Sequence, residues 1–156
     1  ELKDSTWDAV RTGLFKVANE PKGTAWWRRG LGNQMAGKTG TSQVVGAHNE
    51  EQLYAKCDQK EYRFRHHGVF VAFAPFDNPK IAVAALVEHG CAGSKAAAPI
   101  VEKVINTYMK KYMPKDYEKN VIKEKAQFSK YLKKRANARK KAEEKKARTE
   151  IKKEEV

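Results

Sequence analysis

Long hydrophobic runs are absent from this sequence. No stretch of about 18 residues is apolar enough to form a membrane-spanning helix. The sequence also lacks the charged, apolar and small-residue regions that make up a secretory signal peptide. It begins at Glu1 rather than at a methionine, and we expect it to be the C-terminal piece of a longer protein.

Cysteine is scarce, and its spacing does not match the usual zinc-binding patterns. Neither Cys57 nor Cys91 belongs to a C-x-x-C pair, and no H-x-x-x-H spacing accompanies His66 and His67, which follow Asp58. We therefore expect no metal site and no cofactor. An oxidising compartment would permit a disulfide between the two cysteines, but a sequence does not establish connectivity. Two unpaired thiols are the default prediction.

Acidic residues are too few to balance the basic ones. The chain carries 32 Lys and Arg against 19 Asp and Glu, which gives a formal net charge of +13. From Lys115 to the end there are 16 basic and 8 acidic residues, and neither Gly nor Pro occurs after Pro114. We predict a globular region over residues 1–113 and a basic, Lys/Glu/Ala-rich tail over residues 114–156.

The tail has high helix propensity, but few large apolar side chains. Those between Val121 and Leu132 could dock an amphipathic helix, whereas residues 133–156 have little to bury and are expected to be a solvated helix or disordered. A basic tail leaves open a binding module for nucleic acid or anionic membrane. Acidic residues are interspersed, and no aromatic residue follows Tyr131, so we expect no nucleic-acid partner.

Two amphipathic helices are expected in the globular region. The first, which Ser5 can cap, has an apolar face made of Trp7, Val10, Leu14 and Val17. The second has Pro99 in its first turn and a buried stripe made of Ile100, Val101, Val104, Ile105 and Tyr108. In Trp26-Trp27-Arg28-Arg29, one tryptophan is expected to pack beneath the following strand, and the arginines are expected to be solvated.

Three strands are expected over residues 35–45, 68–74 and 80–88. The second and third are near-continuous apolar runs, which is typical of strands with both faces covered. Asp77-Asn78-Pro79 predicts a turn that makes them an antiparallel hairpin. The polar connection over 46–67 is long enough to be a lid or disordered. The predicted fold class is α+β, with three antiparallel strands packed against helices.

The most informative motif is Lys38-Thr39-Gly40-Thr41, inside the first expected strand. Lys38 places a cation where it can assist proton transfer from a neighbouring hydroxyl and attract an anionic group. Thr39 and Thr41 are two residues apart and share a strand face, so their hydroxyls suit a carboxylate. Gly40 has no side chain and would let an extended peptide lie along the strand edge.

The motif and its surroundings resemble a known family. Lys-Thr-Gly is one signature of penicillin-binding proteins and serine β-lactamases. Glu20-Pro-Lys-Gly-Thr-Ala25 resembles the loop before the active-site strand of class B penicillin-binding proteins, and residues 36–44 resemble that strand. Residues 67–88, with Ala72-Phe73-Ala74-Pro75 and an Asn-Pro turn, resemble the next hairpin, most closely in the elongation-type group, penicillin-binding protein 2. The resemblance extends to about Met113.

This resemblance implies the C-terminal part of a penicillin-binding, β-lactamase-like transpeptidase domain. Such an enzyme is a peptidoglycan D,D-transpeptidase: it cross-links stem peptides through a serine acyl-enzyme, and β-lactams acylate the same serine. By resemblance, Lys38 and the backbone N–H of Thr41, an oxyanion-hole donor, are catalytic. Thr39, Gly40 and Thr41 would hold the substrate.

The nucleophile of that family is not in this sequence. None of Ser5, Ser42, Ser94 and Ser129 has a lysine three residues later, and no Ser-x-Asn occurs. We therefore expect the intact protein to be the enzyme and this chain alone to be inactive. Upstream residues would distinguish the elongation-type enzyme from a division-type transpeptidase, a β-lactamase or a β-lactam sensor.

The resemblance also implies a cellular setting. It places the enzyme at the periplasmic face of the bacterial inner membrane, anchored by an N-terminal segment that is not in this chain. The partners implied are peptidoglycan stem peptides, β-lactams, a membrane glycan polymerase and other proteins of the elongation complex.

Overall fold

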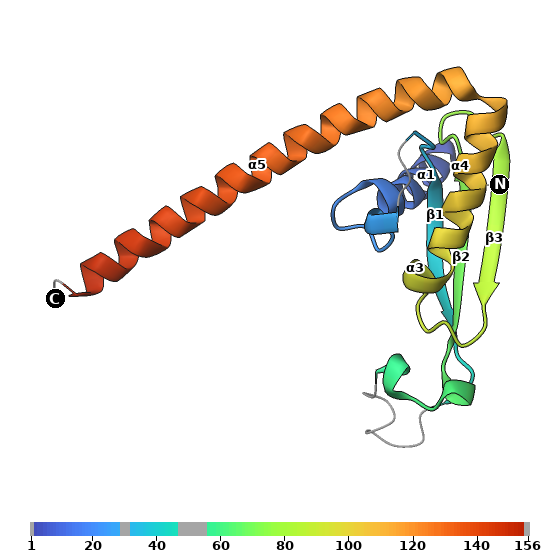
Figure 1. Cartoon of the computed structure of the whole chain (residues 1–156), viewed down its shortest axis with the longest axis horizontal. Coiled ribbons are helices and arrows are strands. Elements are labelled where there is room, and N and C mark those ends of the chain that lie inside the picture. Colours follow the sequence, from blue (N-terminus) through green and yellow to red (C-terminus); the bar gives the residue numbers. More distant parts are fainter. Residues whose placement is uncertain (1, 29–31, 47–55, 155–156) are drawn as a thin grey trace.

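The computed structural model describes residues 2–28, 32–46 and 56–154. A three-stranded antiparallel sheet lies at its centre, with helices α1 (Asp4–Asn19) and α4 (Ala98–Tyr112) packed against it. Helix α5 (Pro114–Glu154) leaves the sheet as one long rod (Figure 1). This mixture of helices with a small antiparallel sheet confirms the predicted α+β class.

The sheet has the strand order β1-β2-β3, and both neighbouring pairs are antiparallel. The strands span Ala36–Ser42 (β1), His67–Ala74 (β2) and Ile81–Val87 (β3). All three predicted strands are confirmed, although β1 ends at Ser42 rather than at residue 45. The predicted hairpin joins β2 to β3.

One face of the sheet is buried beneath α4, and this layer forms the core. Its most buried members are Phe70, Ala72 and Ala74 of β2 and Val101, Ile105 and Met109 of α4, all at most 5% exposed. The strand supplies every second residue, and the helix supplies residues four apart. Fully burying each larger aliphatic or aromatic side chain contributes about 1.5–3 kcal/mol.

The predicted buried stripe of α4 is wrong at two positions. Ile100 and Val104 are 49% and 44% exposed, and Met109 is buried in their place. The cause is the rotation of the helix about its axis, because the sheet lies along the Val101 side rather than the Val104 side. Pro99 does stand in the first turn, and a short helix α3 (Gly93–Ala96) precedes it.

The other face of the sheet is covered only in part. Leu14 of α1 lies over β1, whereas Val71 and Leu86 are 44% and 57% exposed on the same face. Ala82 and Ala84 of β3, which lie on that face beside Leu86, are also exposed. The prediction that both faces of β2 and β3 are covered is therefore wrong for this chain.

Helix α1 begins at Asp4, earlier than a cap at Ser5 allows, so Ser5 lies inside the helix and does not cap it. Lys3 occupies the cap position, and no side chain makes a capping hydrogen bond. Trp7 and Val10, on the predicted apolar face, are 53% and 48% exposed.

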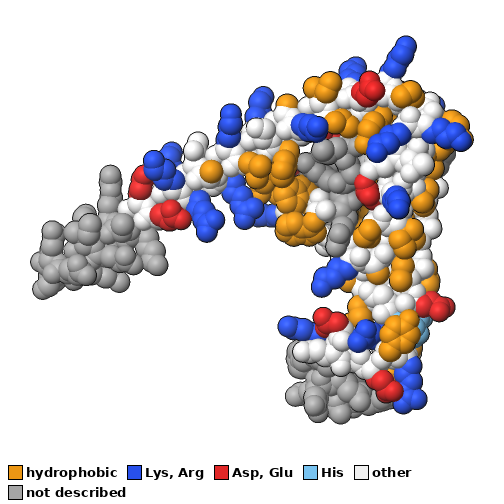
Figure 2. Space-filling model, viewed as in Figure 1, with side chains coloured by type: hydrophobic (Ala, Val, Ile, Leu, Met, Phe, Trp, Pro, Cys, Tyr) orange, Lys and Arg blue, Asp and Glu red, His pale blue; other side chains and the backbone are white. Residues whose placement is uncertain are grey.

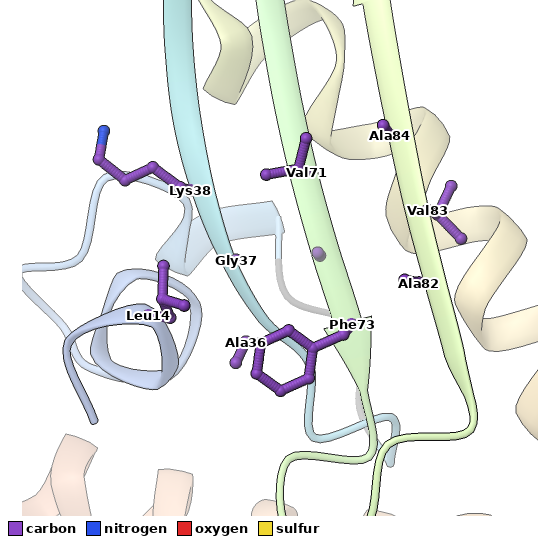
Figure 3. Close-up of a pocket in the computed structure, with 10 residues that line it drawn as sticks. Leu14, Ala36, Gly37, Lys38, Val71, Phe73, Ala82, Val83 and Ala84 are labelled. Atoms are coloured by element: carbon purple, nitrogen blue, oxygen red, sulfur yellow. The ribbon is translucent and has the colours of Figure 1, made fainter. Parts of the chain in front are cut away.

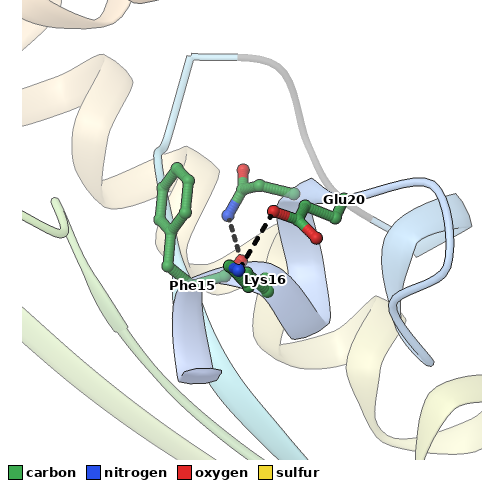
Figure 4. Close-up of polar contacts among 4 residues, drawn as sticks. Phe15, Lys16 and Glu20 are labelled. Atoms are coloured by element: carbon green, nitrogen blue, oxygen red, sulfur yellow. Dashed lines mark hydrogen bonds and ion pairs between the residues drawn. The ribbon is translucent and has the colours of Figure 1, made fainter. Parts of the chain in front are cut away.

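The C-terminal end of α1 is tied to the sheet. The Asn19 amide donates hydrogen bonds to the carbonyl oxygens of Phe15 (2.9 Å) and Met35 (2.8 Å), the latter immediately before β1. Lys16 and Glu20 form an exposed ion pair at 3.8 Å on the same end (Figure 4). Asn19 thus links the end of α1 to the start of β1. These two hydrogen bonds hold the turn that follows α1 in place relative to β1.

Helix α5 docks through its first half. Glu124 is 6% exposed, and its Oε2 accepts a hydrogen bond from the Gly32 N–H at 3.0 Å. The Trp26 ring lies 5.9 Å from Phe128 and 5.7 Å from Tyr131 between centroids. The prediction that a tryptophan packs beneath the strand is therefore wrong for Trp26, which packs against α5. The side chains of the two arginines that follow the tryptophans lie outside the described residues.

The second half of α5 buries nothing that the structure describes. Every described side chain from Leu132 to Lys145 is exposed. Figure 2 shows Lys and Arg side chains projecting from this part of the rod on several sides. The helix nevertheless continues to Glu154. No helix within the described residues is both long and apolar enough to cross a membrane. The division into residues 1–113 and 114–156 stays a prediction.

The connection between β1 and β2 contains two short 3-10 helices, Cys57–Gln59 and Tyr62–Phe64. Residues 47–55, the centre of the predicted lid or disordered segment, lie outside the described residues. Cys57 and Cys91 form a disulfide with Cα atoms 5.6 Å apart. The prediction of two unpaired thiols is therefore wrong. The antiparallel hairpin brings this connection and the turn after β3 to the same end of the sheet, which sequence separation does not reveal.

Candidate functional site

The site predicted from the sequence lies on an edge strand. β1 pairs with β2 along one side, and no strand among the described residues pairs with its other side. α1 packs against β1, and the turn after α1 reaches Thr39. An edge strand of this kind offers backbone N–H and C=O groups to an extended peptide.

Lys38 lies on the partly open face of the sheet, opposite Val71. Its side chain is exposed, and its Nζ donates a hydrogen bond to the Thr39 carbonyl oxygen at 2.6 Å. Figure 3 shows it extending from β1 on the side where Leu14 of α1 lies. An apolar groove of about 300 Å³ runs from Leu14 past Lys38 to Val71 and Ala84. The cation thus stands at the border of an apolar surface.

Thr39 and Thr41 lie on the opposite face from Lys38. In the register they pair with Phe70 and Gly68, two positions of β2 that share a face. Thr39 is half-buried and Thr41 is exposed. The cation and the two hydroxyls therefore lie on opposite faces of the same edge strand, and a ligand along the free edge of β1 would have both kinds of group beside it.

A further hydroxyl touches this group. Thr24, in the turn between α1 and the short helix at Trp26–Arg28, has its Oγ1 3.2 Å from the Oγ1 of Thr39. Sequence reasoning did not single out Thr24, although it belongs to the Glu20–Ala25 loop that carried part of the resemblance. The resemblance of that loop to the family was the one sequence feature that pointed to Thr24. No helical or strand periodicity predicts that residue 24 contacts residue 39.

The two glycines of β1 have different reasons to be glycine. A Cβ added at Gly37 would lie 2.5 Å from the Val71 carbonyl oxygen and 2.9 Å from the Phe70 ring, so packing within the chain excludes a side chain there. A Cβ at Gly40 would meet the Val69 Cβ at 3.4 Å, an ordinary contact. Within the described residues, packing does not require glycine at position 40.

The disulfide and a group of histidines lie beyond the C-terminal end of β1. His66 Nδ1 accepts a hydrogen bond from the Val44 N–H at 3.3 Å, and the His66 carbonyl accepts one from the Cys91 N–H at 2.8 Å. Burial, followed by the positive charges of Lys60 and His67, lowers the pKa of His66. A neutral imidazole keeps Nδ1 available as an acceptor, so this network links the segment after β1 to the disulfide.

Metal-binding side chains do not gather anywhere in the described part of the chain. No group of three or more His, Cys, Asp or Glu residues there has positions suited to a metal ion. His66 instead contacts Cys57 through its backbone N–H, at 3.3 Å from Sγ, and Cys57 is committed to the disulfide.

The sequence matches one family of known domains. Residues 1–106 match the family described as penicillin binding protein transpeptidase domain. Two curated relatives are named peptidoglycan D,D-transpeptidase MrdA. The Haemophilus influenzae protein is 34% identical over 76% of this chain, and the Escherichia coli K12 protein is 33% identical over 70%. The chain spans only 18% and 17% of the lengths of these two relatives.

Solved structures show the same relationship. The chain is similar to penicillin-binding protein PBP2 of Helicobacter pylori, solved in complex with MreC, with 33% identity and a TM-score of 0.58. That match covers 71% of this chain and 19% of the other. It is also similar to PBP2 of Pseudomonas aeruginosa in complex with WCK 5153, with 36% identity and a TM-score of 0.54 over 70% of this chain and 21% of that one.

Proposed function

This chain belongs to the penicillin-binding protein transpeptidase family, and from that membership we propose that it supplies the substrate-binding strand of a peptidoglycan D,D-transpeptidase. The curated relatives bear that activity in their names. The observation that carries the proposal is the arrangement on β1. Among the described strands β1 has one unpaired edge. Its exposed cation, Lys38, lies on one face of the strand, and the hydroxyls of Thr39 and Thr41 lie on the other.

The reaction proposed is acyl transfer between stem peptides. A serine hydroxyl attacks the penultimate D-alanine carbonyl, the peptide bond breaks, and the terminal D-alanine leaves with a proton on its amine. An amine of a neighbouring stem peptide then attacks the acyl-enzyme ester, forms the new peptide bond and releases the serine. None of the four serines of this chain has the Ser-x-x-Lys pattern, so the nucleophile proposed here lies outside these 156 residues.

The β1 residues have distinct roles in this scheme. Lys38 provides positive charge beside the reacting hydroxyl, and its charge also attracts an anionic substrate. The backbone N–H of Thr41 stabilises the oxyanion that develops on the carbonyl oxygen; losing such a donor costs about 10²–10³ in rate. The hydroxyls of Thr39 and Thr41 bind the terminal carboxylate of the substrate.

Gly40 supports the placement of the peptide on this edge. Packing within the described residues leaves room for a Cβ at Gly40 but not at Gly37, so the position of Gly40 leaves space beside β1. An extended ligand backbone along β1 would use that space. β-Lactams, which carry a carboxylate beside a reactive carbonyl, are proposed to occupy the same place.

The experiment that tests the function is covalent labelling by a fluorescent penicillin. The purified protein that carries this chain together with its preceding sequence should be acylated in proportion to active protein, and excess unlabelled penicillin should block the label. The 156-residue chain alone is the matched control and should show no adduct by mass spectrometry. An acylated serine in the chain alone, or no acylation of the larger protein, would contradict the proposal.

The proposed setting is the periplasmic face of the bacterial inner membrane. The disulfide between Cys57 and Cys91 supports an oxidising compartment, because such bonds persist there and are rare in the cytosol. We also propose proteins of the elongation complex as partners, since the H. pylori relative was solved with MreC, and a membrane glycan polymerase by analogy with the family. Protease treatment of spheroplasts should digest the domain without cell lysis; protection would place it in the cytosol.

A further inference from the structure

We propose that Thr24 is a positioning residue that orients the Thr39 hydroxyl toward the carboxylate of the ligand. The proposal rests on the function proposed above and deepens it, because it concerns how the ligand's anionic end is recognised. Its basis is the contact between two hydroxyls from segments 15 residues apart, with Thr24 Oγ1 3.2 Å from Thr39 Oγ1.

The turn that carries Thr24 is held in place on both sides. The Gly23 N–H donates to the Glu20 carbonyl at 2.8 Å, and the Ala25 N–H donates to the Val17 carbonyl at 3.1 Å. Ala25 is fully buried. A Cβ at Gly23 would clash with the Val17 carbonyl, so the turn also packs tightly against the end of α1. Thr24 is therefore presented to β1 by a backbone that has little freedom to move.

The direction of the hydrogen bond follows from the number of protons. Each threonine hydroxyl has one proton to donate and lone pairs that accept. A carboxylate only accepts, so Thr39 must donate its proton to the ligand when the ligand is bound. The proton between Thr24 and Thr39 must then come from Thr24. This donation holds the Thr39 oxygen in place and polarises its O–H bond, which strengthens the bond to the carboxylate.

This role makes Thr24 a specificity determinant. Its contribution is largest when Thr39 donates to a negatively charged carboxylate, and it is smaller for a methyl ester, whose carbonyl oxygen accepts a hydrogen bond but carries no charge. Removing the Thr24 hydroxyl removes one neutral hydrogen bond and leaves Thr39 free to rotate. We expect a loss of about two- to tenfold in the acylation rate constant for carboxylate ligands.

The test compares two acylating ligands on each protein variant. The purified protein that carries this chain together with its preceding sequence is acylated by benzylpenicillin and, separately, by its methyl ester, and the ratio of the two second-order rate constants is recorded. Because both constants come from one protein sample, this acid-to-ester ratio does not depend on the fraction that is folded. Thr24→Val should lower the ratio about two- to tenfold, and Thr24→Ser, which keeps the hydroxyl, should restore it.

Two further variants separate the alternatives. In a Thr39→Val background, Thr24→Val should leave the ratio unchanged, because the hydroxyl that it orients is gone. Thr107→Val, which removes a hydroxyl bonded to the Lys103 carbonyl on α4, is the matched remote control and should keep the wild-type ratio. A wild-type ratio in Thr24→Val would overturn the positioning role. If the wild-type protein reacts with neither ligand, the proposed function itself fails, which is a different result.

Discussion

Helices α4 and α5 are separated by Met113 alone, yet they are stabilised in different ways. α4 has 15 residues and buries Val101, Ile105 and Met109 completely against the sheet. α5 has 41 residues, and Glu124 is the buried side chain among those of α5 that the structure describes. The length of a helix therefore says little about its contribution to the fold. The apolar area that it buries decides that contribution.

The outer half of α5, from Leu132 onward, is a helix whose described side chains to Lys145 are all exposed, so among these residues only local interactions stabilise it. Its described contacts are local, such as the Arg139–Glu143 pair at 3.5 Å, in which both side chains are largely exposed. Pairs of this type add only about 0.2–0.5 kcal/mol each. In contrast, α4 closes the core over β2, and β2 positions β1. The placement of the β1 residues thus depends on α4, which buries apolar surface, more than on the longer α5.

The largest effect is expected from a cavity in α4. Ile105→Ala should lower the free energy of unfolding of the purified protein by about 2–5 kcal/mol, because Ile105 is fully buried. Leu132→Ala on α5, where the side chain is 45% exposed, should change it by less than about 0.5 kcal/mol. Urea unfolding measures both. Equal effects would remove the contrast between the helices.

The Cys57–Cys91 disulfide joins the connection after β1 to the turn after β3, and its removal measures how much it stabilises that end of the sheet. Replacing both Cys57 and Cys91 by serine should lower stability by about 2–4 kcal/mol, since the bond closes a loop whose ends are 34 residues apart. Reductant should destabilise the wild-type protein by a similar amount and leave the double variant unchanged. If reductant acted equally on both proteins, the bond would not be the cause.

A substitution on β1 should affect chemistry rather than folding. Thr41→Val is expected to slow acylation by a carboxylate-bearing β-lactam about ten- to a hundredfold, because a hydrogen bond to a charged group contributes about 1.5–3 kcal/mol. The melting temperature should stay at the wild-type value. Lys140→Ala on the outer half of α5 is the matched change in the other region and should alter neither quantity. Unchanged acylation in Thr41→Val would remove this threonine from the site.

The two helices should also differ in their response to pH. Glu102 of α4 accepts a hydrogen bond from Asn106, and burial raises its pKa above the ordinary value of 4.5, with Lys110 acting in the opposite direction. Its favourable contribution is complete below pH 4.5 and is lost as the pH rises through the raised pKa. Glu102→Gln should therefore gain stability relative to wild type between pH 4 and pH 7 in thermal melts. Asn137→Ala on α5, which changes an exposed side chain and removes no titratable group, should show no such trend.

The smallest effect is expected from shortening α5. Ending the protein after Leu132 should leave the melting temperature and the acylation rate nearly unchanged, because residues 133–145 have exposed side chains throughout. Phe128→Ala should lower stability more, by about 0.5–1.5 kcal/mol, since it removes the ring contact with Trp26. A drop of more than a few degrees on truncation would show that the outer half of α5 packs against the domain.

The three strands and the placement of the Lys38–Thr41 motif on a strand could be predicted from the sequence, because both follow from patterns among neighbouring residues. Apolar runs with β-branched residues predicted β2 and β3, and a two-residue spacing placed Thr39 and Thr41 on one strand face. The buried side of α4 was predicted less well. Ile100 and Val104 have the same helical spacing as Val101 and Ile105, so periodicity alone cannot select between two adjacent faces.

Composition and local order thus determined that this chain has an α+β body with a basic, helix-prone extension, and that Lys38-Thr39-Gly40-Thr41 lies on a strand. Tertiary structure alone decided that Cys57 pairs with Cys91, that Trp26 packs on α5, and that Thr24 meets Thr39. Each of these contacts joins residues distant in the sequence. Their geometry follows from how the sheet and helices pack, and no local pattern in the chain encodes such a distance.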